Sequence, residues 1–127
     1  MVRTVLIATV AVALLVLAGC DRPPDAPTDR GVCWHAATTR DGKIKFNKLA
    51  ENVPDMEHCA AQLEAMRLRF IGLGSTTTEI AGVYQGNWLF LQREGVFTAQ
   101  TMDGNRYPFM VRTGDGRLAV PGAMPTQ

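Results

Sequence analysis

The sequence has few residues of the kinds that carry out chemistry. Its 127 residues include two histidines, three cysteines and a single serine, Ser75. Ser75 lies in a glycine-rich stretch with no neighbouring base, and neither histidine is close to it in the sequence. We expect Glu57 and Glu64 on the polar side of a helix and Asp103 and Asp115 in turns, so no two carboxylates are paired for acid–base work. These absences predict a protein that is not an enzyme and binds no cofactor.

The chain also lacks an excess of charge of either sign. It has 13 basic and 12 acidic residues, and the loss of Arg3 with an N-terminal signal would leave 12 of each. Nucleic-acid-binding domains carry a basic face, and polybasic membrane patches need clustered lysine and arginine. The balance therefore argues against a nucleic-acid partner and against a polybasic membrane surface.

No apolar run is long enough to span a membrane. The longest one follows Arg3, extends from Val5 to Ala18 and stops at Gly19 and Cys20. A transmembrane helix needs about 20 apolar residues. A positive charge followed by a short apolar run is instead the layout of a secretion signal.

The run ends in four residues typical of a processing site, Leu17, Ala18, Gly19 and Cys20. They resemble the lipobox of bacterial lipoproteins, in which small residues before a cysteine allow signal peptidase II to cut the chain. The resemblance implies that residues 1–19 are removed and that Cys20 carries a diacylglycerol and an N-acyl chain such as palmitate. Two or more acyl chains hold a protein stably on a membrane. Asp21 resembles the residue that retains lipoproteins in the inner membrane, so we expect the periplasmic side of the inner membrane rather than the outer membrane.

The mature chain is expected to have two parts. Residues 20–30 hold the lipidated cysteine and the stretch DRPPDAPTDR. This stretch has three prolines and no large apolar residue, which is typical of a disordered tether. Residues 31–127 are enough for one small domain. Its patterns predict an α+β fold, with an N-terminal hairpin and one helix packed on an antiparallel β-meander.

Hydrophobic periodicity predicts the elements of this domain. A hairpin is expected from the runs 32–36 and 43–46, which flank an Asp-Gly turn. A helix is expected over 55–71, because apolar residues recur at spacings of three and four and Gly72 follows as a stop. The residues on this stripe are Met56, Cys59, Ala60, Leu63, Met66 and Phe70. Regularly spaced turn signals then predict strands near 77–85, 88–93, 96–102, 106–112 and 117–120.

The strand near 88–93 is apolar on both faces. Side chains alternate along a strand, so Trp88 and Phe90 share one face and Leu89 and Leu91 share the other. One helix covers only one face of a sheet. We therefore expect the sheet to close into a barrel or sandwich. The alternative is that Trp88 and Phe90 are left exposed as a partner-binding patch.

Two cysteines remain once Cys20 is lipidated. An even pair in an oxidising compartment predicts a Cys33–Cys59 disulfide between the first strand and the first helical turn. Each of these cysteines has a histidine nearby, so Cys33, His35, His58 and Cys59 form an alternative metal-binding set. Residues 58 and 59 diverge by about 100° on a helix, and the spacing matches no common zinc pattern, so we expect no metal. Two free buried thiols are the third alternative.

Together these features predict a membrane-anchored envelope lipoprotein that is not an enzyme. We expect its domain to bind another envelope protein, as an accessory or assembly module of a membrane complex. The first alternative is a metal or ligand carrier that uses the Cys/His set. The second is a periplasmic inhibitor of a wall-degrading enzyme, a function that some small lipoproteins with β-rich, disulfide-bonded domains perform. The chain resembles these inhibitors only in its expected architecture.

Overall fold

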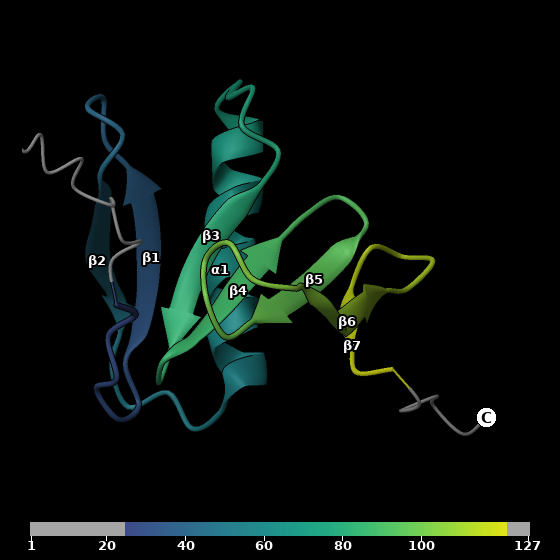
Figure 1. Ribbon diagram of the computed structural model, residues 1–127. Coiled ribbons are helices and arrows are strands. Elements are labelled where there is room, and N and C mark those ends of the chain that lie inside the picture. The colour runs from purple at the N-terminus through teal and green to yellow at the C-terminus, as the bar shows by residue number, and fades with distance from the viewer. Residues whose placement is uncertain (1–24, 122–127) are drawn as a thin grey trace, which may run out of the picture.

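A computed structural model describes residues 25–121 of the chain. The expected signal segment and Cys20 lie outside this range. Within it, seven antiparallel strands form one open sheet, and one helix lies against the sheet (Figure 1). Among these residues, no helix is long and apolar enough to cross a membrane.

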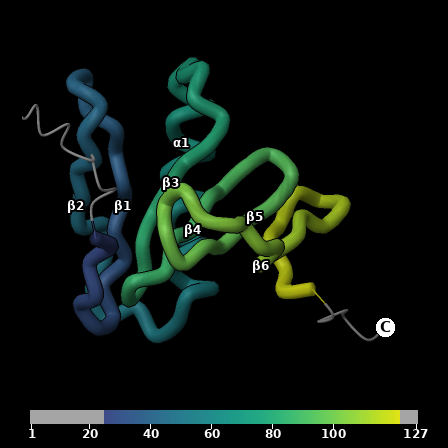
Figure 2. The backbone as a smooth tube through the Cα atoms, in the orientation of Figure 1, coloured from purple at the N-terminus to yellow at the C-terminus, as the bar shows by residue number. Residues whose placement is uncertain are grey.

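The domain begins with a hairpin, continues through a helix and ends in a meander. The elements in chain order are β1 (Cys33–Thr38), β2 (Ile44–Ala50), α1 (Met56–Gly72), β3 (Ile80–Tyr84), β4 (Asn87–Leu91), β5 (Gly95–Ala99), β6 (Tyr107–Arg112) and β7 (Leu118–Ala119). The strand order in the sheet is β2-β1-β3-β4-β5-β6-β7. After β2, the chain passes through α1 and returns to the sheet as β3, which pairs with the edge of β1 that faces away from β2. The later strands then follow in sequence order (Figure 2). The predicted α+β fold, with its hairpin, helix and antiparallel meander, is confirmed.

The helix α1 covers one face of the sheet. Its residues Cys59, Ala60 and Leu63 are fully buried in a cluster that includes the β4 side chains Leu89 and Leu91. A glycine at position 82 in β3 allows this close approach. A Cβ atom there would lie 2.4 Å from Leu63 Cδ1 and 2.6 Å from the carbonyl oxygen of Trp34, so a larger residue would push α1 and β1 away from β3.

A disulfide joins Cys33, the first residue of β1, to Cys59 in the first half of α1, with the two Cα atoms 5.3 Å apart. Both side chains are fully buried in the core between the helix and the sheet. The predicted pairing is confirmed. It fixes the start of the helix on the hairpin, at the point where β1 begins to pair with β3.

The second face of the sheet is covered by a loop. Trp88 and Phe90 lie on this face and are each 2% exposed. The segment 100–106, between β5 and β6, crosses in front of β3 and β4 (Figure 1). From this segment Met102 packs on the cluster, and the Arg106 guanidinium carbon lies 3.5 Å from the centre of the Phe90 ring. The prediction of a closed barrel or sandwich is therefore wrong, because a loop supplies the cover that closing strands would give.

The N-terminal segment joins the domain earlier than the sequence indicated. The N–H of Gly86 donates a hydrogen bond to the carbonyl of Pro27 over 3.0 Å, and Ala26 packs on the second-face cluster. Gln85 and Gly86 have φ values of 47° and 83°, the left-handed pair that a type I′ hairpin turn needs. The fold thus begins at Ala26, on the β3–β4 turn and the second face, rather than near Gly31.

Glu64 is buried, contrary to the prediction that it lies on the polar side of the helix. Its carboxylate accepts two hydrogen bonds from Arg112 in β6, over 2.6 and 3.0 Å, and a third from Arg67 over 3.3 Å. Arg112 also donates to the carbonyls of Gln92 and Arg93 in the β4–β5 turn. Helix periodicity predicted a polar position for Glu64, whereas the partner that satisfies its buried carboxylate comes from a strand 48 residues away.

Replacing both cysteines of the disulfide should destabilise the domain. In the double variant Cys33→Ser/Cys59→Ser, we expect the free energy of unfolding to fall by about 3 to 4 kcal/mol, because the unfolded chain regains the entropy of a loop of about 27 residues. Urea denaturation followed by tryptophan fluorescence measures this change. Adding a reductant should lower the stability of the parent protein and leave that of the double variant unchanged. Equal stability of the parent and the variant would contradict the prediction.

Removing the charge of Glu64 should also destabilise the domain. The variant Glu64→Gln leaves the buried Arg67 and the part-buried Arg112 without their carboxylate, which costs about 3 kcal/mol or more. Glu94→Gln, in the exposed β4–β5 turn, is the matched control and should change the free energy of unfolding by less than about 0.5 kcal/mol. The same denaturant titration tests both variants, and similar values for the two would show that the Glu64 pairs add no stability.

Candidate binding groove

A groove forms where the β1–β2 hairpin and β3 diverge. The pairing of β1 with β3 ends at Ala36 and Ala81, whereas the pairing of β1 with β2 continues to Thr38 and Ile44. Beyond Ala36 the hairpin therefore leaves the rest of the sheet. The last turn of α1 and the segment 73–79 lie on the other side of the gap.

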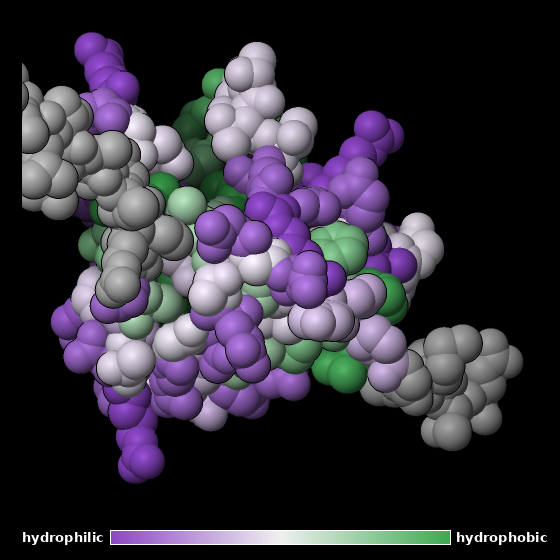
Figure 3. Space-filling model, viewed as in Figure 1, coloured by the Kyte–Doolittle hydropathy of each residue, from purple (hydrophilic) through white to green (hydrophobic). Residues whose placement is uncertain are grey.

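The groove has a volume of about 900 Å³. Its lining is mostly apolar and comes from β1, β2, α1, β3, β4 and the segments 73–79 and 100–106. Its large apolar side chains are Ile44, Phe70, Leu73, Ile80, Trp88, Phe90 and Met102. Figure 3 shows hydrophobic surface recessed between the tip of the hairpin and the segment that follows α1. A concave, largely apolar surface of this size is typical of a binding site.

The polar groups that line the groove carry no net charge. Glu79 and Arg106 form an ion pair over 2.9 Å, so their charges cancel. The imidazole of His35 is half-buried and packs edge-on against Phe70, with the ring centres 6.4 Å apart. This burial lowers the pKa of His35 below its ordinary value, which favours the neutral ring. The remaining polar side chains of the lining are the hydroxyls of Thr38, Ser75 and Thr77.

The far wall of the groove is held by the buried charges of α1. Arg67, which pairs with Glu64, donates a hydrogen bond from Nε to the carbonyl of Thr78 over 2.9 Å. Within the segment, the N–H of Thr77 donates to the hydroxyl of Ser75 over 3.1 Å. The Glu64 network therefore positions the loop that faces the hairpin.

Trp88 and Phe90, the expected partner-binding residues, form the floor of this groove. They do share one face of β4, and Leu89 and Leu91 share the other, as the alternation predicted. Each ring is only 2% exposed, and Trp88 packs against Phe46 with the ring centres 5.7 Å apart. The alternative prediction of an exposed aromatic patch is therefore wrong: the rings support the groove from below.

The structure separates the four residues of the alternative metal set. The sulfur atoms of Cys33 and Cys59 are joined in the disulfide. The ring of His58 is exposed and its Nδ1 lies 2.6 Å from the Asp55 carboxylate, whereas His35 lines the groove. Between residues 25 and 121, no group of three or more metal-ligating side chains is close enough to hold an ion.

Ser75 and His35 both line the groove, which their distance in the sequence did not suggest. In the described part of the chain no hydrogen bond joins them. The Ser75 hydroxyl accepts from Thr77, and the His35 ring contacts Phe70. A serine nucleophile needs a base within hydrogen-bond distance, so the pair as placed lacks the arrangement of a hydrolase.

Comparisons of the chain with protein-family models, with curated proteins and with solved structures find no match.

The burial of His35 should make the stability of the domain depend on pH. A lowered pKa in the folded state means that the unfolded chain binds more protons near pH 6, so this contribution is complete above pH 6.5 and is lost as the pH falls. The free energy of unfolding should therefore decrease between pH 7.5 and pH 5 by more in the parent protein than in His35→Gln. Denaturant titrations at several pH values measure both slopes, and parallel curves for the two proteins would contradict the assignment.

Proposed function

We propose that this chain is a bacterial envelope lipoprotein, anchored through acylated Cys20 on the periplasmic side, with the inner membrane favoured. Its domain is a non-enzymatic binding module, and the groove between the β1–β2 hairpin and β3 is its binding site. The groove takes an uncharged, apolar segment of a partner envelope protein. The observation that carries this proposal is the groove itself, which is apolar in its floor and neutral at its rim.

The composition of the groove supports a peptide segment as its occupant. The walls offer apolar surface for burial at the half-buried Ile44 and Phe70 and at the exposed Leu73, and such burial contributes about 25 cal/mol for each Å² removed from water. Thr38, Ser75 and Thr77 are exposed at the mouth, where their hydroxyls can bond to the backbone N–H and C=O groups of a bound chain. Since a charged side chain would find no unpaired opposite charge in this lining, the segment should be uncharged.

The N-terminal sequence supports the anchor. Leu17, Ala18, Gly19 and Cys20 match the lipobox pattern, and a buried disulfide suits an oxidising compartment outside the cytosol. A lipid anchor confines the domain to the membrane surface, so a partner in the same membrane meets it at a high effective concentration. Modest affinity in the groove is then sufficient for an accessory subunit.

The anchor is tested by the mass of the protein purified from bacterial membranes. We expect an N-terminus at Cys20 that carries diacylglycerol, and incorporation of labelled palmitate that is lost in Cys20→Ala. The double variant Cys33→Ala/Cys59→Ala is the matched control, because it removes two cysteines and should keep the label. An unacylated precursor in the soluble fraction would contradict the anchor.

The groove is tested by photo-crosslinking in intact cells, with a benzophenone side chain placed at Ser75 in the groove or at Gln62 on the exposed side of α1. We expect a crosslinked partner only from position 75. The crosslinked residues of that partner should lie in an uncharged, apolar segment, and a synthetic peptide of the segment should bind the purified protein. Ala37→Trp, which places a bulky ring in the groove, should abolish both results while leaving the melting temperature of the domain similar.

Equal crosslinking from both positions would contradict the proposed site. So would a bound segment rich in charged residues, or peptide binding that persists in Ala37→Trp.

A further inference from the structure

We infer that one end of the domain, formed by the last turn of α1, the segment 73–78 and the tip of the β1–β2 hairpin, rests on an anionic membrane surface. We call it the membrane-facing end. The inference rests on the lipid anchor proposed above and adds an orientation, which the anchor alone does not give. It also makes the groove open toward the bilayer, because Thr38, Leu73 and Ser75 belong both to this end and to the groove.

The helix side of this end is apolar and exposed. Leu68, Ile71 and Leu73 are 56%, 41% and 79% exposed, although soluble helices usually turn such side chains toward the core. The stretch from Phe70 to Thr78, FIGLGSTTT, contains no charged residue. A protruding, uncharged segment with large apolar side chains fits the interface between lipid headgroups and acyl chains.

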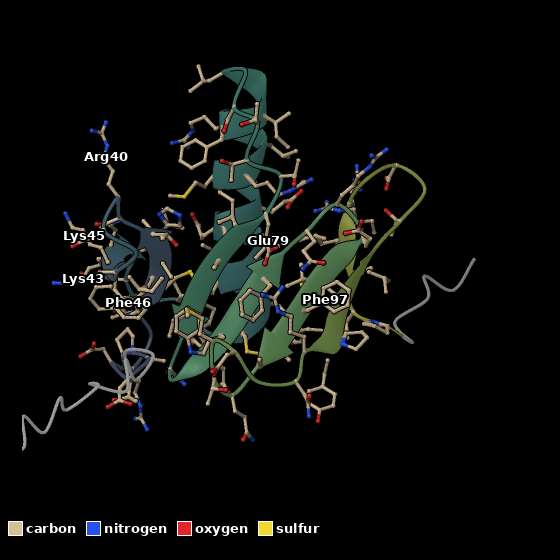
Figure 4. The ribbon with its side chains drawn as sticks, turned by 45° about the horizontal axis from the view of Figure 1, so that its top comes forward. Arg40, Lys43, Lys45, Phe46, Glu79 and Phe97 are labelled. Atoms are coloured by element: carbon tan, nitrogen blue, oxygen red, sulfur yellow. A yellow bond between two sulfur atoms is a disulfide. The ribbon has the colours of Figure 1, made fainter. Side chains whose placement is uncertain are left out.

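The hairpin side of the same end is basic. Arg40, Lys43 and Lys45 are exposed and point outward from the hairpin, away from the sheet (Figure 4). In the described residues Asp41 is the one carboxylate that pairs with any of them, over 3.9 Å to Lys43. Lysines also protect an edge strand such as β2 from pairing with other chains. That role does not account for Arg40, which lies in the turn.

The opposite end of the domain, where α1 starts, is acidic. Glu51, Asp55 and Glu57 lie there, close to the N-terminus of the helix, together with Lys48, which pairs with Glu51 over 2.7 Å. Acidic side chains therefore outnumber basic ones at this end, and basic side chains outnumber acidic ones at the membrane-facing end. An anionic bilayer attracts the end that carries Arg40, Lys43 and Lys45 and repels the other.

The course of the chain toward the anchor agrees with this orientation. Traced toward the N-terminus, the chain leaves Gly31 beside Val53, near the start of α1, passes Pro27 at the β3–β4 turn and reaches Ala26 on the second face. Gly31 and Pro27 both lie at the end where α1 starts, and from Ala26 the chain turns along the hairpin in the direction of the membrane-facing end (Figure 2). Cys20 precedes Asp25 by five residues, which extend over at most about 18 Å, so the bilayer must lie close to the domain.

The orientation is tested with the acylated full-length mature protein in vesicles of phosphatidylcholine with or without phosphatidylglycerol. An environment-sensitive fluorophore is attached through Thr76→Cys at the membrane-facing end, or through Glu51→Cys at the opposite end. Nitroxide-labelled lipid headgroups report contact by quenching. We expect strong quenching at position 76 and little at position 51, with the difference reduced by 1 M salt, which shortens the screening length to about 3 Å.

Charge reversal separates this surface from non-specific attraction. Arg40→Glu/Lys43→Glu should weaken the contact about fivefold for each positive charge removed. Arg30→Glu/Lys48→Glu makes the same change in net charge near the acidic end and should keep the quenching at position 76. Leu73→Asp should reduce the quenching even in the absence of phosphatidylglycerol, because it removes an apolar contact.

The outcomes distinguish the orientation from the anchor. A purified protein that has no acyl mass and does not float with the vesicles contradicts the anchor and the orientation together. A protein that floats, with positions 76 and 51 quenched equally, or with the Arg30/Lys48 variant as impaired as the Arg40/Lys43 variant, contradicts the orientation alone.

Discussion

The structure depends on one constraint: its sheet is apolar on both faces, and the chain has one helix to cover them. The helix α1 covers the face of Leu89 and Leu91 and is fixed there by the Cys33–Cys59 disulfide. The other face is covered by loop 100–106 and the N-terminal segment from Ala26. The groove lies at the gap where the hairpin leaves β3, above the buried rings of Trp88 and Phe90 and beside Met102 of the covering loop.

Local sequence patterns predicted the elements because each one depends on neighbours in the chain. The helix follows from a stripe with Cys59 and Leu63 at its centre, and the strands follow from alternation between turns. The disulfide followed from the number of cysteines and the inferred compartment. Glu64 could not be placed in this way, because its burial depends on Arg112 in a distant strand. Trp88 and Phe90 are likewise covered by a loop, and hydrophobic periodicity does not predict where a loop runs.

The groove and the basic end both depend on where residues lie in the fold, which sequence patterns and composition do not give. In the sequence, Phe70 and Leu73 lie at the end of a predicted helix. They line the groove together with Ile44 because the β1–β2 hairpin diverges from β3. The balance of acidic and basic residues argued against a basic membrane surface, but composition does not say where the charged residues lie. The β1–β2 hairpin places Arg40, Lys43 and Lys45 at one end of the domain, and Glu51, Asp55 and Glu57 lie at the other, near the start of α1. A domain without net charge can therefore have one basic end, and the groove lies at that end.

The central claim is that the groove is occupied when the protein works in its membrane. Hydrogen–deuterium exchange compares the protein in intact envelopes with the purified acylated protein in detergent. The account predicts slower exchange in envelopes at the backbone amides of Ala37, Thr38 and residues 75–78, where a bound segment excludes water, with unchanged exchange at residues 60–65 in the centre of α1. Identical exchange at the groove amides in the two preparations would contradict it.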